Sequence, residues 1–170
     1  EYIHVVRSLL HEGAVDFEGE AHRVSATVQL PDVAPCPILL AALGPRMLRV
    51  AGELADGTIT WMAGPKALAT RIVPQITDAA ERAGRGPLRI CVGVPIAVTD
   101  DPEATREVLK KDLGSYGRLP SYRLLLDIEG VDEPYEVALI GDEAEVERQL
   151  RALADTGATD LLAMEYPLGE

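Results

Sequence analysis

The sequence has few cysteines, and they are poorly spaced for a metal site. Only Cys36 and Cys91 occur in the 170 residues, without the paired spacing that zinc-binding cysteines show. Both lie in or beside apolar segments, and disulfides are rare in a reducing compartment. We therefore predict two buried free thiols, no disulfide and no metal site.

Basic residues and long apolar runs are also scarce. Lys and Arg number 16 against 28 Asp and Glu, which gives a formal net charge of −12. Nucleic-acid-binding proteins usually carry a basic patch, so no nucleic-acid partner is predicted. No apolar run approaches the roughly 18 residues of a membrane-spanning helix. These absences favour an acidic, cytoplasmic enzyme that has no contact with membranes.

Common catalytic motifs are missing as well. The sequence contains no Walker loop, no nucleophile elbow and no metal-ligand motif. Its three histidines, His4, His11 and His22, stand far from the ends of the predicted strands. We therefore expect these histidines to lie at the surface or at helix ends, outside a catalytic cluster.

What is present is a compact strand–helix–strand unit. The apolar run 38–43 stops at Gly44-Pro45, an amphipathic segment covers 46–54, and a second apolar run covers 58–62. Such a unit predicts two parallel strands joined by a helix. Backbone N–H groups at the start of that helix favour phosphate, so a cofactor that carries phosphate is the first functional expectation.

The spacing of apolar residues predicts alternating helices and strands over most of the chain. Helices are expected over 2–11, 66–83, 102–113, 121–128 and 143–154, strands over 38–43, 58–62, 88–98 and 159–166, and a hairpin over 14–30. This alternation is typical of an α/β fold with a parallel sheet.

Proline and glycine mark the irregular places in this pattern. Pro74 is expected to kink the helix at 66–83. Gly93 and Pro95 indicate a bulge in the strand at 88–98. An irregular segment is expected ahead of the strand at 38–43, at Pro31, Pro35 and Pro37.

The segment A-A-L-G-P-R-M-L-R-V-A-G-E-L-A-D-G, residues 41–57, resembles the luciferase-like flavin and deazaflavin oxidoreductases. Within that family it is most similar to the members that use coenzyme F420. Three later segments agree: 98–103 resembles the turn after strand seven, 141–150 the last long helix, and 157–162 strand eight. The resemblance covers nearly the whole chain.

This resemblance implies a TIM (β/α)8 barrel. A complete barrel typically needs about 250 residues. We therefore expect residues 1–170 to be the C-terminal half of a single barrel domain, about strands five to eight with their helices and an excursion hairpin. The N-terminal half is absent, so two strand edges are expected to be exposed.

Active sites of such barrels lie at the C-terminal ends of the strands. The glycine of the first turn lets a phosphate approach the backbone, and the proline fixes φ for entry into the helix. Arg46 is expected to add a charged contact. Trp61 either walls a ring-binding pocket or packs under a loop. The predicted cofactor-binding residues are Ala42, Leu43, Gly44, Pro45, Arg46, Met47 and Trp61.

Two acidic residues attract attention but carry no assigned role. Asp56 is expected to be a turn residue at the opposite end of the barrel, where stability residues lie. Glu165 ends the last strand, where it either reaches the pocket or lies in solvent. The family's proton-handling residues usually lie in the N-terminal half, so no catalytic residue is assigned.

By resemblance, the protein is an oxidoreductase that transfers a hydride between coenzyme F420 and a small organic substrate. The isolated 170-residue chain is expected to be inactive. Two alternatives stay open: an FMN-dependent luciferase-like monooxygenase, and a non-catalytic half-barrel that binds phosphate. A homodimer is a candidate assembly state.

Overall fold

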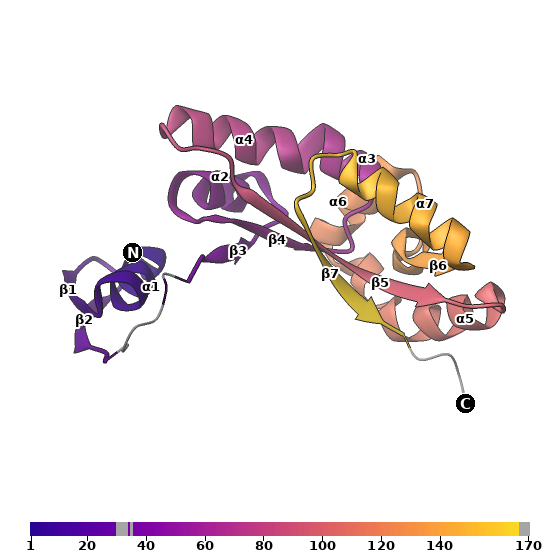
Figure 1. The fold of residues 1–170 in the computed structure, drawn as a ribbon, viewed down its shortest axis with the longest axis horizontal. Helices are drawn as coiled ribbons and strands as arrows, with labels where there is room; N and C mark the ends of the chain where they lie inside the picture. The colour runs from indigo at the N-terminus through magenta and orange to yellow at the C-terminus, as the bar shows by residue number, and fades with distance from the viewer. Residues whose placement is uncertain (30–33, 35, 167–170) are drawn as a thin grey trace.

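The computed structural model describes residues 1–29, 34 and 36–166. The last residue of the expected hairpin, Leu30, lies outside this range, as do Pro31 and Pro35 of the expected irregular segment. In the described part the chain forms a helix with a hairpin, followed by a parallel sheet with helices packed on it (Figure 1).

The N-terminal part confirms the expected helix and hairpin. Helix α1 spans Tyr2–Glu12 and ends at Gly13, whose φ of 75° is left-handed. Strands β1 (Ala14–Glu18) and β2 (Arg23–Thr27) pair antiparallel. The Glu1 carboxylate accepts backbone N–H bonds of 2.9–3.0 Å from three hairpin-turn residues, Glu20, Ala21 and His22. These bonds tie the turn to the start of α1.

Five strands form the parallel sheet. They are β3 (Leu39–Ala41), β4 (Gly57–Trp61), β5 (Arg89–Val98), β6 (Leu139–Gly141) and β7 (Asp160–Glu165). The central β5 pairs along one edge first with β4 and then with β6, and along the other edge with β7. The predicted strand–helix–strand unit is confirmed, because β3 and β4 pair in parallel.

Helices connect the strands at close to their expected positions. They are α2 (Pro45–Leu54), α3 (Pro65–Ala67), α4 (Val73–Arg82), α5 (Pro102–Leu113), α6 (Pro120–Glu129) and α7 (Glu143–Ala154), with short 3-10 turns at Tyr116–Arg118 and Pro134–Val137. Two begin with carboxylate caps: Asp101 accepts from Ala104 N–H and Asp142 from Glu145 N–H. None of the helices in the described residues is long and apolar enough to cross a membrane.

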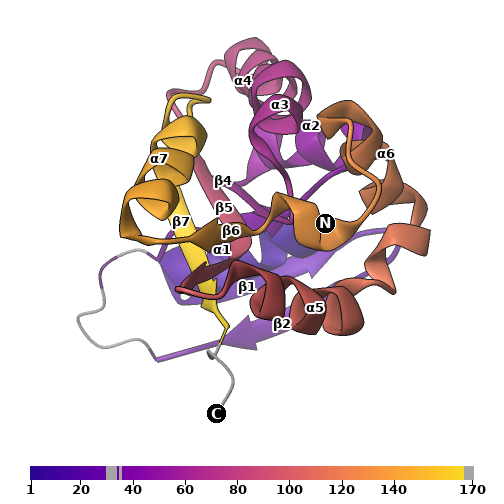
Figure 2. The same ribbon diagram turned by 90° about the vertical axis from the view of Figure 1, so that its right-hand side faces the viewer.

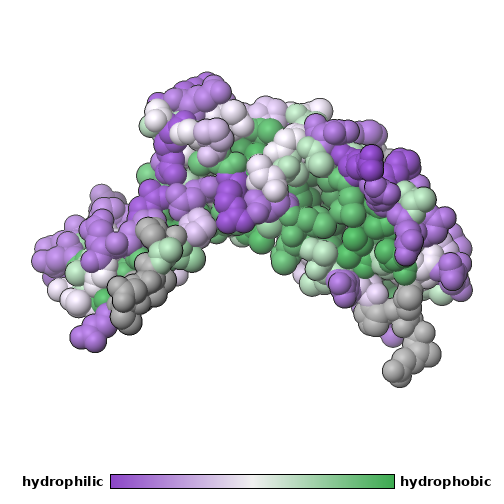
Figure 3. Space-filling view, in the orientation of Figure 1, coloured by the Kyte–Doolittle hydropathy of each residue, from purple (hydrophilic) through white to green (hydrophobic). Residues whose placement is uncertain are grey.

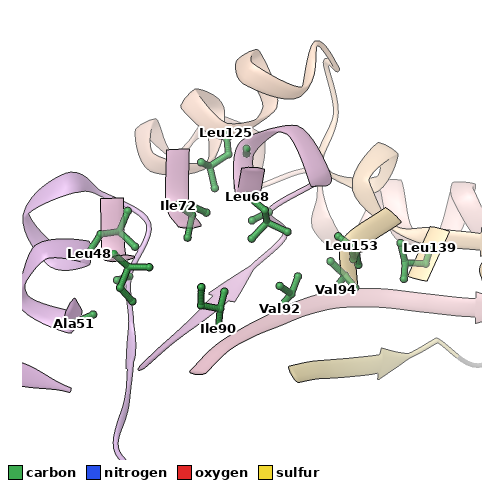
Figure 4. Close-up of a cluster of buried hydrophobic side chains, with 14 residues drawn as sticks. Leu48, Ala51, Leu68, Ile72, Ile90, Val92, Val94, Leu125, Leu139 and Leu153 are labelled. Atoms are coloured by element: carbon green, nitrogen blue, oxygen red, sulfur yellow. The ribbon is translucent and has the colours of Figure 1, made fainter. Parts of the chain in front are cut away.

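Helices α2, α3, α4, α6 and α7 cover one face of the sheet (Figures 1 and 2). Side chains alternate between the two faces of a strand, so every second residue of β5 points toward the helices. The resulting core is shown in Figure 4. It joins β5 to helices on that face through Ile90, Val92, Val94, Leu48, Leu68, Ile72, Leu125 and Leu153. Burial of this apolar surface is the main force that holds the helical layer to the sheet.

The other face of the sheet is open. Figure 3 shows a concave outline with an apolar region exposed below the sheet. On β7, Leu162 and Met164 are 48% and 45% exposed. By register they share a face with Gly93 and Pro95 of β5, away from the helices. A curved parallel sheet with helices outside and an apolar inner face is the arrangement of a partial (β/α)8 barrel.

Two aspartates join neighbouring segments at the N-terminal ends of the strands, through ion pairs and hydrogen bonds. Asp56 accepts a hydrogen bond from Ile38 N–H (2.8 Å) and pairs with Arg7 (3.0 Å) and Arg85 (3.4 Å). Thus Asp56 is a turn residue that also ties α1 to the sheet. Asp160 on β7 accepts two hydrogen bonds from the guanidinium of Arg89 on β5.

The helical path changes type just ahead of Pro74, where a kink was expected. Between α3 and α4, residues Leu68–Ile72 form a π-helical turn, so the helical path continues from Pro65 to Arg82. A proline lacks the N–H for the i→i−4 bond, and its ring clashes with that carbonyl. A π-helical turn widens the helix just ahead of Pro74 and accommodates both effects.

The expected bulge at Gly93 and Pro95 was wrong, because the pairs that β5 makes run without an inserted residue. The Gly93 carbonyl accepts from Met62 N–H (2.8 Å), so odd residues of β5 direct their backbone groups toward β4 and β6. Pro95 falls between the last pair with β4, at Gly93, and the first pair with β6, at Ile96. No strand there requires the N–H that proline lacks.

Strand β6 was not predicted. It has three residues and follows directly on a 3-10 turn. So short an apolar segment has no readable period, and only its neighbour β5 makes it a strand.

Candidate functional site

A groove lies at the C-terminal ends of β3 and β4, where barrel enzymes place their sites. Its volume is about 510 Å³, and it opens on the concave side of the sheet. The lining residues are Ala41, Ala42, Leu43, Gly44, Met47, Ile59, Thr60, Trp61, Ser121, Tyr122 and Leu162. Five of the seven predicted cofactor-binding residues therefore come together here: Ala42, Leu43, Gly44, Met47 and Trp61.

The turn between β3 and α2 presents free backbone donors. Gly44 is the N-cap of α2, with φ −89° and ψ 155°, and Pro45 is the first helical residue. No side chain caps this helix in the described part of the chain. The first turn of a helix leaves its N–H groups without intrahelical partners, so those of Arg46 and Met47 are available to an anion.

Gly44 itself leaves room for a ligand. A Cβ built at this position finds no atom within 4 Å, and φ is ordinary for any residue. Neither backbone strain nor internal packing therefore calls for glycine. Thr60, in the same lining, pairs with Val92, so its 2% exposed side chain lies on the helix-facing side of the sheet. The open space at Gly44 and the free N–H groups fit a bound group that carries phosphate.

A second Gly-Pro turn follows β4 and is closed from within the protein. The Glu129 carboxylate, buried at the end of α6, accepts a 2.6 Å hydrogen bond from Ala67 N–H in the first turn of α3. Lys66 Nζ donates to the Glu129 carbonyl at 2.7 Å. A Cβ at Gly64 would come within 2.5 Å of that carboxyl group. Here an internal carboxylate occupies the position that is open at α2.

Trp61 owes its position to its neighbours. It lies opposite Gly93 of β5, where a Cβ would come within 3.1 Å of the indole ring. The next residue, Met62, has φ 53°, in the left-handed region that a methionine rarely adopts. This turn sends the buried Met62 into a second apolar cluster while Trp61 lines the groove. Such strain at a strand end is common at functional sites.

The other two predicted residues lie elsewhere. Pro45 and Arg46 line a separate groove of about 500 Å³ between α2 and α4, with Arg49, Glu53, Gln75, Asp78, Ala79 and Arg82. The structure thus brings Arg46 to the outer, helical side. Its backbone N–H remains in the first turn of α2.

Sequence reasoning missed the part of the groove that α6 supplies. Ser121 and Tyr122 come from 60 residues beyond Trp61. Tyr122 falls in the predicted helix over 121–128, and the apolar pattern of that helix gives no sign of a ligand. The Tyr122 ring packs edge-on against Tyr116, with centroids 5.0 Å apart. Burial, and next the neighbouring Tyr116, raise the pKa of Tyr122, so its hydroxyl is neutral near pH 7.

The remaining candidates lie outside the groove. Glu165 is exposed and by register lies on the helix-facing side of β7. His11 bonds the Cys36 carbonyl at 2.9 Å and His22 the Glu1 carboxylate at 3.4 Å, both at exposed positions. Both cysteines are free, but only Cys91 is buried, so the prediction for Cys36 was wrong. Burial raises the pKa of the Cys91 thiol, which makes it a poor nucleophile.

Residues 1–160 match the family described as luciferase-like monooxygenase. This chain belongs to the luciferase-like family. It is 30% identical over 153 residues to an F420-dependent glucose-6-phosphate dehydrogenase of Nakamurella multipartita, a match that covers 87% of this chain and 43% of the relative. The chain therefore spans less than half the length of that luciferase-like relative.

Solved structures confirm the barrel fold. A coenzyme F420-dependent tetrahydromethanopterin reductase from Methanopyrus kandleri superimposes with a TM-score of 0.80 at 22% identity, over 96% of this chain and 55% of the other. The oxygenating constituent of 3,6-diketocamphane monooxygenase from Pseudomonas putida, in complex with FMN, gives 0.63 at 17% identity, again over 96% and 55%. At these identities the likeness shows the fold that the luciferase-like family shares.

Proposed function

We propose that the protein to which this chain belongs transfers a hydride between coenzyme F420 and a small organic substrate. The observation that carries the proposal is the uncapped first turn of α2, which meets the groove at Gly44. The relatives support the choice of cofactor, because the Nakamurella multipartita enzyme and the Methanopyrus kandleri reductase are both named for dependence on F420.

In this proposal, the chain's residues bind and orient the cofactor. F420 supplies the hydride chemistry through its deazaflavin ring. The N–H groups of Arg46 and Met47 hold a phosphate group of the cofactor, and the space at Gly44 lets it approach the backbone. Trp61, Ala42 and Leu43 form an apolar wall beside the ring and exclude water. Proton-handling groups are expected in the other half of the barrel.

The test is a single added charge in the whole protein. Gly44→Asp places a carboxylate where the phosphate is expected and should weaken F420 binding by roughly 1–3 kcal/mol, the scale of a mispaired polar group. F420 affinity is measured by fluorescence titration after thermal melts have checked folding. Gly86→Asp is the matched control, because Gly86 also has open space around its Cβ position but lies in the loop before β5. Unchanged affinity in a folded Gly44→Asp protein would place the phosphate elsewhere.

The second candidate function is that of an FMN-dependent monooxygenase, which the FMN complex of the camphane enzyme favours. Titrating the same protein with FMN separates the two: F420 should bind more tightly, and equal or tighter FMN binding favours the monooxygenase. We further expect the 170-residue chain alone to show no steady turnover, and turnover by the isolated chain would support a self-sufficient half-barrel.

A further inference from the structure

The first turn of α2 borders two grooves at once. Gly44 and Met47 line the groove that holds the ring in the proposed function, called here the cofactor groove. Pro45 and Arg46 line the groove of about 500 Å³ between α2 and α4, called here the outer groove. Successive residues of a helix point in directions about 100° apart, so one turn serves both sides. A ligand bound at this turn can therefore extend into both grooves.

The outer groove has both of its walls in this chain. Helices α2 and α4 lie side by side (Figure 1). They pack closely at Gly52, where a Cβ would come within 2.6 Å of that of Ala79. Adjacent outer helices of a barrel belong to consecutive strand–helix units. The other half of the barrel is therefore not needed to form this groove.

Arginine side chains stand at the end of the outer groove nearest the first turn of α2. Arg46 lies in that turn and Arg49 follows three residues later, so the two are neighbours on one face of the helix. Both are exposed. The whole chain has a formal net charge of −12, which makes two adjacent arginines a local exception. This end of the groove suits an acidic group.

The two carboxylates of the outer groove lie farther from the first turn. Glu53 is in the last turn of α2 and pairs with Arg49 at 3.8 Å. Asp78 of α4 lies level with the contact between the two helices and pairs with Arg82 at 3.0 Å. An acidic chain that entered from the turn would meet Arg46 first. It would then compete with Glu53 for Arg49, and exposed pairs of this kind are weak.

F420 carries its phosphate between the chain that bears the ring and an acidic tail of glutamate units. With the phosphate at the first turn of α2 and the ring in the cofactor groove, the tail must leave on the other side of the phosphate. We propose that the outer groove binds this tail, and that Arg46 and Arg49 pair with its carboxylates. This inference rests on the proposed function. It gives the Arg46 side chain a ligand on the outer, helical side.

The experiment compares two forms of the cofactor on the whole protein. One is F420 with its glutamate tail, and the other is the form that ends at the phospholactate group and lacks the glutamates. Fluorescence titration gives the Kd of each. We expect the form with glutamates to bind about fivefold more tightly at low salt, the scale of one exposed ion pair. The difference should shrink at about 0.5 M salt, because salt screens exposed charges.

Charge reversal locates the contact. Arg46→Glu and Arg49→Glu should each raise the Kd of the form with glutamates by about tenfold, because an attraction becomes a repulsion, and that of the shorter form by less than about threefold. Arg151→Glu on α7 is the matched control, because Arg151 is also exposed and pairs with a carboxylate four residues away, that of Glu147. It changes the net charge equally and should leave both Kd values within about twofold of the parent.

The outcomes separate this inference from the proposed function. Absence of F420 binding to the parent protein would overturn the proposed function and, with it, this inference. Equal affinity of the parent for the two forms would overturn this inference alone. The same holds if Arg46→Glu and Arg49→Glu weaken both forms equally, or if Arg151→Glu weakens the form with glutamates as much as they do.

Discussion

The turns Gly44-Pro45-Arg46-Met47 and Gly64-Pro65-Lys66-Ala67 have similar sequences and equivalent places, each after a parallel strand and at the start of a helix. The second is closed by the Glu129 carboxylate, whereas the first has no side-chain cap and opens on a groove. The closed turn shows that such a turn binds an anion in this protein. The open turn is the one that we propose binds an anion from outside.

Removing the Glu129 carboxylate should have the largest effect on stability. Glu129→Ala leaves the first turn of α3 without its acceptor, in a buried place, and should lower the free energy of unfolding by about 2–3 kcal/mol. Urea unfolding of the whole protein measures this. Asp127→Ala on the same helix removes an exposed ion pair with Arg123 and should cost less than about 1 kcal/mol. Equal losses in the two variants would mean that Glu129 has no special part in the closed turn.

Crowding the closed turn should have the next largest effect. Gly64→Ala places a Cβ within 2.5 Å of the Glu129 carboxyl, which is held by its bond to Ala67. The side chain must shift, so we expect a loss of about 1–3 kcal/mol, as for overpacked cores. The change in the urea midpoint gives the value. A fully stable variant would show that Glu129 can move aside freely.

Lowering the pH should affect stability through the N-terminal ends of the strands, far from both turns. Hydrogen bonds from Arg89, and next from Thr159, lower the pKa of Asp160 to about 2, from an ordinary 3.8. Because the pKa of Asp160 is lower in the folded state, its ionised carboxylate contributes to the free energy of unfolding. That contribution is present above pH 4 and is lost as the pH falls toward 2. Asp160→Asn should therefore flatten the decline of stability between pH 4 and pH 2. An unchanged pH profile would show that the pair of Arg89 and Asp160 adds nothing to the free energy of unfolding.

The smallest effect on stability is expected at the open turn. Gly44→Ala adds a methyl group where no atom lies within 4 Å, at a φ that alanine adopts freely. The free energy of unfolding should change by less than about 0.5 kcal/mol, as at ordinary surface positions. Thermal melts beside those of Gly64→Ala make the comparison direct. A loss similar to that of Gly64→Ala would mean that the two turns are packed alike.

The sequence was most informative where a pattern is local. The turn at Gly44-Pro45 and the amphipathic helices follow from rules that span a few residues, and the predicted bounds agree with the structure to within one or two residues at most ends. The family resemblance then placed the turn at Gly44 at the rim of the barrel. Five predicted residues share the groove for that reason.

What could not be read from the sequence depends on contacts between distant segments. Tyr122 reaches the groove because α6 packs against α3, and Glu129 closes the second turn from 62 residues away. Three-residue β6 exists only because β5 continues beyond the end of β4. Arg46 was expected near the ligand, but the direction of a side chain at the first turn of a helix depends on which neighbour it meets. Here the neighbour is α4.

Pro95 has a consequence for how the sheet assembles. It lies where the edge of β5 passes from one partner strand to the next, the one place on that edge where a missing N–H is harmless. If β4 slid along β5 by two residues, its inward and outward side chains would keep their faces, but Trp61 would lie opposite Pro95, where no donor exists. The hydrophobic pattern alone does not oppose such a slide, because it has a period of two. The proline does oppose it, and so it fixes the alignment in which Trp61 meets Gly93.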